Sequence, residues 1–341
     1  MHPIESSYAA FVRQFRQQLE AAESQYRDQV RPPHADVEEV CLSQRAVLHF
    51  LDVAPGGPHF VAALRFAVQL QAWAAYRRHR QLYVVDERLA EPLSAATWPE
   101  ALDVGTLFLP VPGTAISMQL AKNTARAHFI GFYDVASGPQ GAHRQLRFVQ
   151  LAPDGALVPC ASLLLDGGRL EDALQTEAES LRMYIEGRRR WAPADAVTQY
   201  LRAAQATLGG EMSSRGHLLR QLLNVLLYIH GNKDVVARIH PGRKPTSARP
   251  RSLRRAHEKQ EPTTFDVGRA FSATLEHWEQ EDRRMAAMEL PAQHVRPHVR
   301  RAHLHLYWTG KGRETPKFQL VRPTLVRGGN DGQAPATRRV R

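Results

Sequence analysis

The segment VRRAHLHLYWTG, residues 299–310, alternates polar and apolar residues. Its polar positions carry side chains that can move protons or hold anions, namely Arg301, His303, His305 and Tyr307. Side chains on a strand alternate between its two faces, so these four are expected to share one face. Histidine exchanges protons near neutral pH, and arginine can hold a phosphate through two hydrogen bonds. The set could therefore act on a phosphodiester bond without a metal, with Tyr307 as a further proton donor.

Other interpretations of this polar face remain open. A surface that only binds RNA or a protein partner uses the same residue types, because contacts to phosphate need cationic and hydrogen-bonding groups but no catalysis. Two histidines two positions apart also resemble half of a zinc site, yet only Glu314 and Asp331 are acidic between residues 296 and 341. A cation site among so many arginines is unfavourable, so we expect no metal and no other cofactor. Binding is favoured over catalysis, and ribonuclease activity stays an alternative.

The positive charge of the chain is concentrated in its last third. Residues 240–341 hold 21 Lys and Arg against 10 Asp and Glu, which accounts for the whole formal net charge of +11. Such asymmetry is typical of a polyanionic partner, here mRNA or the ribosome, although a solvated basic tail has the same composition. The expected contact residues lie in a proline-rich loop at 240–263 and around the polar strand: Arg243, Lys244, Arg249, Arg251, Arg254, Arg255, Arg296, Arg300, Lys311 and Arg322.

These residues must be positioned by an α+β fold in which helices pack on small antiparallel sheets. Hydrophobic periodicity predicts helices and strands in alternating blocks. The predicted helices cover residues 3–30, 58–79, 166–187, 194–207, 214–230 and 267–288, and the predicted strands cover 81–86, 128–135, 145–151, 156–165, 234–239, 299–308 and 317–326. The charged segment RRRWAPAD at 188–195 interrupts two helical patterns and favours two domains. They comprise residues 1–190, an α+β domain, and 191–341, a basic α+β domain with a frayed tail.

The composition excludes several classes of protein. The longest apolar stretch, residues 59–76, is interrupted by Arg65, Gln69 and Gln71, which predicts no membrane span. No secretory signal is recognised at the start, and two cysteines are too few for a disulfide framework or a zinc ribbon. A cytoplasmic location is therefore expected. The sequence gives no indication of the oligomeric state.

Three segments together resemble a known family. They are LLNVLLYIHGNKDV (222–235) followed by GRKPTSARP, FDVGRAF (265–271), and RPHVRRAHLHLYWTGKGRETPKFQLVRPTLVRG (296–328). Their order is similar to that of an anti-CRISPR family, found on phages and plasmids, which acts against production of the type V-A CRISPR effector nuclease. The resemblance covers about residues 215–328. The family strand usually has a bulky aromatic residue where Leu304 or Leu306 stands, a difference that concerns packing more than the polar face.

This resemblance implies a function coupled to translation. Family members are understood to recognise the emerging N-terminal peptide of their target and to trigger degradation of the message being translated. The resemblance then implies a nascent polypeptide as one partner, with residues 1–190 as the target-recognition half, and mRNA or the ribosome as the other. The alternatives are an autonomous metal-independent ribonuclease, with His303 and His305 as acid and base and Arg301 on the phosphate, and a nucleic-acid-binding regulator of a mobile element.

Overall fold

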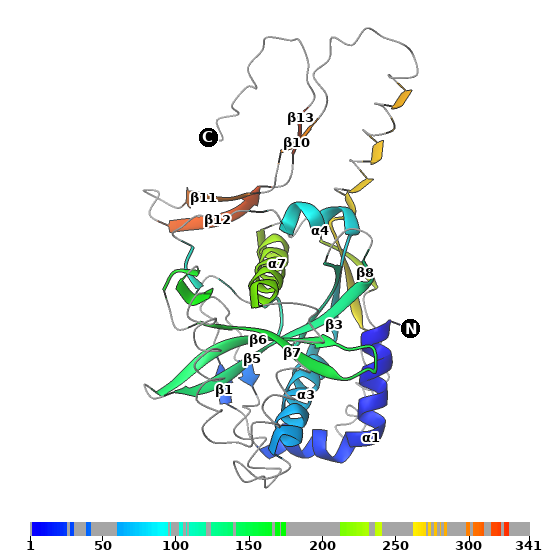
Figure 1. Ribbon diagram of the computed structural model, residues 1–341, viewed down its shortest axis with the longest axis vertical. Coiled ribbons are helices and arrows are strands. Elements are labelled where there is room, and N and C mark those ends of the chain that lie inside the picture. Colours follow the sequence, from blue (N-terminus) through cyan, green and yellow to red (C-terminus); the bar gives the residue numbers. More distant parts are fainter. Residues whose placement is uncertain are drawn as a thin grey trace, which may run out of the picture.

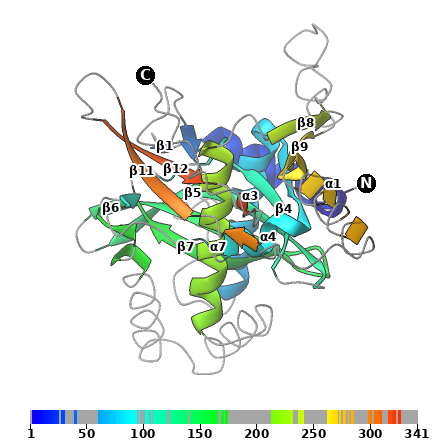
Figure 2. The ribbon, with the colours of Figure 1, turned by 90° about the horizontal axis from the view of Figure 1, so that it is seen from above.

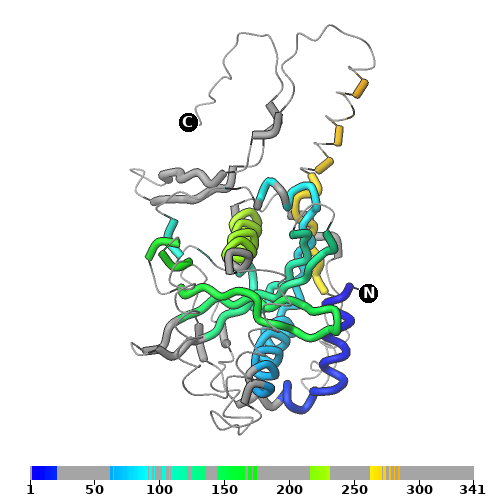
Figure 3. Tube along the Cα trace, viewed as in Figure 1, coloured from blue at the N-terminus to red at the C-terminus, as the bar shows by residue number. Residues whose placement is uncertain are grey.

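The structure of the protein is a computed structural model. It describes residues 2–25, 28–30, 39–41, 60–94, 96, 102–104, 107, 109–120, 124–138, 141–165, 168–170, 172–174, 212–231, 236–240, 262–270, 272–273, 276–277, 280, 283–284, 298–300, 303–309, 315–321 and 324–326 (Figure 1). Figure 3 shows the Cα trace in the same view.

A seven-stranded mixed sheet forms the centre of the fold, with the strand order β7-β6-β5-β4-β3-β9-β8 (Figure 1). The interior strand β3 runs parallel to both of its neighbours, β4 and β9, and all other pairs are antiparallel. Its sequence LYVV is largely buried, as is typical of a parallel strand covered on both faces. The strands are β3 Gln81–Val85, β4 Thr114–Gln119, β5 Arg126–Gly138, β6 Gly141–Leu151, β7 Leu157–Leu164, β8 Val236–His240 and β9 Thr263–Val267.

Helices cover both faces of this sheet and produce two apolar cores. The helices that do so are α1 Pro3–Gln25, α3 Phe60–His79, α4 Glu87–Ser94 and α7 Met212–Gly231. Residues of α1 and α3 pack on Leu82 and Ala115, whereas residues of α4 and α7 pack on Val85 and Ile116. Because neighbouring residues of a strand point to opposite faces, one strand supplies both cores. Seen from above, α7 crosses the middle of the sheet (Figure 2).

Three smaller ribbons complete the described secondary structure. Each consists of two antiparallel strands. They pair β1 Asp28–Val30 with β2 Glu39–Cys41, β10 His298–Arg300 with β13 Thr324–Val326, and β11 His303–Thr309 with β12 Thr315–Val321. The strand β12 lies beside α7, so the β11–β12 ribbon is on the face of the sheet that α7 covers.

The α+β class is confirmed, and so are the helices expected at 58–79 and at 214–230. The helix expected over 3–30 is confirmed for Pro3–Gln25, whereas Asp28–Val30 forms the strand β1 instead. The main sheet, however, is larger than expected and is mixed instead of purely antiparallel. The division into two domains at residue 190 stays a prediction and is not confirmed, since β8 and β9 extend the same sheet as β3. The helix expected at 194–207 lies outside the described residues. None of the helices in the described part of the chain combines the length and the apolar character that a membrane span needs.

Candidate functional site

The predicted polar strand is present, and it is one arm of a ribbon. His303, His305 and Tyr307 occupy alternate positions of β11. The register with β12 places Gln319 opposite His305 and Lys317 opposite Tyr307. His303, His305 and Tyr307 therefore alternate along the strand as expected. Two polar residues of β12, Gln319 and Lys317, stand across from His305 and Tyr307, and the sequence alone did not identify them.

The strand expected over 299–308 is described in two pieces, β10 and β11, and residues 301–302 between them lie outside the described residues. β10 pairs with β13 and β11 pairs with β12, and both ladders follow the same antiparallel register. Arg300 lies on β10 opposite Thr324, and Arg301 lies outside the described residues. The common face expected for Arg301 with the histidines therefore stays a prediction.

The other predicted nucleic-acid contacts also stay predictions. All of them except Arg300 fall outside the part of the chain that the structure describes: Arg243, Lys244, Arg249, Arg251, Arg254, Arg255, Arg296, Lys311 and Arg322. Among the described residues, no group of three or more His, Cys, Asp or Glu side chains is placed to hold a metal ion.

A polar cluster at the carboxyl ends of the parallel strands was not predicted from the sequence. Val84 of β3 pairs with Asp266 of β9 on one side and with Ser117 of β4 on the other. His128 of β5 pairs with Ser117 in turn, so these residues form one row across the sheet. In the next row, Arg126 pairs with Gln119. We call this group the strand-end cluster, and it comprises Asp86, Ser117, Arg126, His128 and Asp266.

Hydrogen bonds within the cluster hold the ends of three strands together. The Arg126 guanidinium donates from Nη1 to the carbonyl oxygens of Val85, at 2.9 Å, and of Ser117, at 3.1 Å, and so bridges β3 and β4. The Asp86 carboxylate accepts the backbone N–H of Arg88 at 3.0 Å, which caps α4, and the hydroxyl of Ser272 at 2.5 Å. The backbone N–H of Asp86 also donates to Val267 of β9. Asp86 therefore joins β3, α4 and the segment after β9.

Partial burial shifts the pKa values of two residues of the cluster, Asp266 and His128. Burial raises the pKa of Asp266, and Asp86 adds to the rise. The positive charges of Arg269 and Arg126 oppose it. Burial also lowers the pKa of His128, and Arg126 lowers it further. The Nδ1 atom of His128 and the Oγ atom of Ser117 are buried and have no hydrogen-bond partner among the described residues. The side chains of Arg126 and Asp86 thus bond to backbone groups of β3, β4 and α4 and to Ser272, which makes the main role of the cluster the joining of strand ends.

A local signal for part of this cluster exists in the sequence. Asp86 follows directly after the buried strand LYVV, and Asp266 stands within FDVG, which ends β9. Polar residues at the carboxyl ends of parallel strands often gather at one edge of a sheet. The missing information was the parallel pairing of β3 with β9, two strands about 180 residues apart.

Comparisons with known proteins agree with this architecture. The family model of the AcrVA2-like proteins, described as the anti-CRISPR type V subtype A2 family, matches residues 83–328. Among solved structures, one described as the crystal structure of AcrVA2 is similar to this chain, with a TM-score of 0.54 and 17% sequence identity over 95% of this chain and 98% of the other. At that identity the likeness shows the fold alone. The search of curated proteins found no match. Since the family model spans more than half of the sequence, from β3 to the end of β13, the chain belongs to the AcrVA2-like anti-CRISPR family.

Proposed function

We propose that this anti-CRISPR protein recognises a nascent polypeptide by its N-terminal peptide and triggers loss of the mRNA being translated. The observation that carries the proposal is the family match over residues 83–328, which includes all three segments that resemble the family. The nascent chain and its message are close together only at the ribosome. A protein that acts on both needs one surface for a peptide and another for RNA or ribosomal phosphate.

The charge distribution supports such a division of labour. Residues 240–341 carry the whole net charge of +11, so the first 239 residues are neutral on balance. A neutral α+β portion suits contact with a polypeptide, whereas a basic portion binds the phosphate backbone through release of counterions. The ribbon β11–β12 belongs to the basic portion, and its register adds Lys317 and Gln319 to the proposed RNA surface.

Coupling to translation can be tested with a reporter message in cells. The message should encode the target's N-terminal peptide ahead of an unrelated protein. We expect its level to fall several-fold when the protein is expressed, because recognition requires the emerging peptide. A matched message that lacks the start codon, but is otherwise identical, should keep its level. If both messages fall equally, recognition does not depend on the nascent chain and the proposal is wrong.

The basic loop can be tested by charge reversal. The variant R249E/R251E/R254E/R255E should bind RNA and ribosomes more weakly at every sequence tested, because phosphate contacts carry no base specificity. The slope of log K against log salt should become shallower by about 0.7 for each phosphate of a single-stranded RNA that the variant no longer neutralises. A filter-binding titration at several salt concentrations measures both quantities.

A control with the same change in net charge is available in the neutral portion. The variant R13E/R16E/R65E/R169E reverses four arginines that are exposed on the described surface. It should retain most of the affinity of the parent protein for RNA. Equal losses of affinity in the two variants would mean that only overall charge matters, and that the loop at 240–263 is not the contact surface.

An autonomous ribonuclease is the second candidate, because the structure keeps His303 and His305 at alternate positions of one strand. Purified protein incubated with a synthetic RNA and a chelator separates the two functions. A recruiting protein leaves the RNA intact. Cleavage that disappears in His303→Ala or His305→Ala would favour the enzyme.

A further inference from the structure

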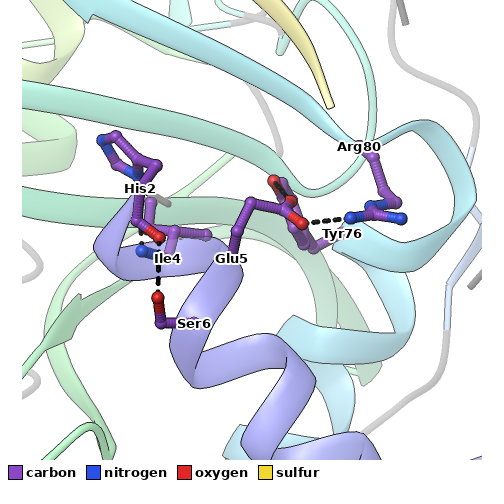
Figure 4. A network of polar contacts seen from close by, with 6 residues as sticks. All are labelled: His2, Ile4, Glu5, Ser6, Tyr76 and Arg80. Carbon is purple, nitrogen blue, oxygen red and sulfur yellow. Dashed lines mark hydrogen bonds and ion pairs between the residues drawn. The ribbon is translucent and has the colours of Figure 1, made fainter. Parts of the chain in front are cut away.

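The first turn of α1 is capped by a histidine. Pro3 is the first residue of the helix, where its lack of an N–H does no harm, and His2 stands at the capping position before it. The imidazole Nδ1 of His2 accepts the backbone N–H of Ile4 at 3.3 Å (Figure 4). The carbonyl of His2 accepts the N–H of Ser6 at 3.0 Å. His2 thus takes the place that Ser, Thr, Asp or Asn usually occupies.

The same imidazole also holds the helix start against the sheet. The rings of His2 and His128 meet edge to face, with their centroids 4.7 Å apart and their planes at 81°. His128 is on β5, two positions from Arg126, and both belong to the strand-end cluster. The beginning of α1 therefore lies over the end of the sheet where Ser117 and His128 have buried polar atoms without partners among the described residues.

The cap hydrogen bond requires a neutral His2. An imidazole that is protonated at Nδ1 has no lone pair there with which to accept the Ile4 N–H. Its positive charge would also stand at the positive end of the helix dipole and close to Arg126 and His128. Burial lowers the pKa of His2 to about 4, and the nearby charges of His128, Arg126 and the amino terminus lower it in the same direction.

A second anchor of the same turn does not depend on a histidine. Glu5 accepts the hydroxyl hydrogen of Tyr76 at 2.5 Å and forms a buried ion pair with Arg80 (Figure 4). Glu5 is 8% exposed and Tyr76 is fully buried, so this anchor is shielded from solvent. It fixes α1 to α3 from Glu5 onward, whether or not His2 is protonated.

We propose that His2 is a pH-dependent latch, which caps α1 and lies over the strand-end cluster when it is neutral and swings away when it is protonated. Opening is confined to this turn, because the Glu5 anchor keeps the rest of the helix in place. It uncovers Ser117 and His128 without unfolding the sheet. This latch lies outside the region that the family model matches, and it does not rest on the proposed function.

The direction of the pH effect follows from the two states of the latch. In the open state His2 is hydrated and titrates near 6.5, whereas in the closed state its pKa is about 4. The open state therefore binds more protons between these values, and the closed state is favoured fully only above about pH 6.5. Acidification from pH 7.5 to 5.0 should lower the ratio of closed to open latch by about tenfold, allowing for the partial exposure of the ring.

Hydrogen exchange of the full-length protein, followed by mass spectrometry, tests the latch. After correction for the intrinsic pH dependence of exchange, the amides of Ile4 and Ser6, which donate to His2, should lose about tenfold protection between pH 7.5 and 5.0, resolved by fragmentation of the peptide covering residues 2–10. Peptides from β4 and β5 serve as the internal reference and should keep their protection. An equal loss in β4 and β5 would show global opening and overturn the proposal.

The variant His2→Asn supplies the matched control. Asparagine accepts the same cap hydrogen bond but does not titrate. Protection of the Ile4 and Ser6 amides in this variant should change less than twofold over the same pH range. If His2→Asn loses protection as the parent protein does, His2 is not the titrating group and the latch is wrong.

Discussion

Replacing Gly113 with alanine is expected to destabilise the protein by more than about 4 kcal/mol, close to the total stability of many domains. Gly113 forms the turn that leads into β4, and its φ of +68° lies in the left-handed region. A Cβ atom built there would stand 2.2 Å from the backbone carbon of Ala75 and 2.2 Å from the backbone nitrogen of Tyr76. Both atoms belong to the backbone of α3, which cannot move without losing its own hydrogen bonds. The methyl group would therefore push β4 away from α3.

The matched control is Gly168→Ala. Gly168 also has a positive φ, +99°, but nothing lies within 4 Å of a Cβ atom added to it. Its substitution introduces backbone strain alone, worth about 1–3 kcal/mol. Urea denaturation followed by circular dichroism measures both variants on one scale. Equal destabilisation in the two would mean that the contact of Gly113 with α3 is unimportant.

Local sequence signals predicted much of the sheet. The strands β5, β6 and β7 stand where alternating apolar segments and turn residues placed them. An Asp-Gly pair is typical of a tight turn, and at Asp154-Gly155 the structure has one: Gly155 has a φ of +85° and Asp154 accepts the N–H of Ala156 at 3.0 Å. Such features could be predicted because each depends on residues a few positions apart.

Features that depend on distant pairing could not be predicted. No strand was predicted at β4, because Thr114–Met118 is buried on both faces and its sequence shows no period of two, so it fits a helix as well as a strand. The parallel pairing of β3 with β9 leaves no local trace, so the mixed sheet and the strand-end cluster were both missed. The predicted nucleic-acid contacts rested on charge alone, which specifies a kind of partner but no backbone geometry.

Neutralising Glu5 is the second change with a large expected effect, about 3 kcal/mol of destabilisation in Glu5→Gln. Glu5 and Arg80 are 8% and 6% exposed, and the Arg80 guanidinium also lies 5.3 Å from the centre of the Tyr8 ring. The amide would remove the negative charge that balances Arg80 in a poorly hydrated place. It would also change the environment of Tyr76, whose pKa is raised well above its ordinary value by burial and then by Glu5.

A double-mutant cycle isolates the contribution of this pair. Because Arg80→Met removes the charge that Glu5 balances, the double variant E5Q/R80M should be more stable than the sum of the two single effects predicts. The exposed pair of Arg88 and Glu276, 3.4 Å apart, provides the control, and Glu276→Gln should change stability by less than about 0.5 kcal/mol. Additive effects at Glu5 and Arg80 would show that the two charges do not stabilise each other. In that case only the apolar contacts of Tyr8 and its neighbours would hold α1 to α3. Those contacts, and not the ion pair, would then confine the opening of the latch.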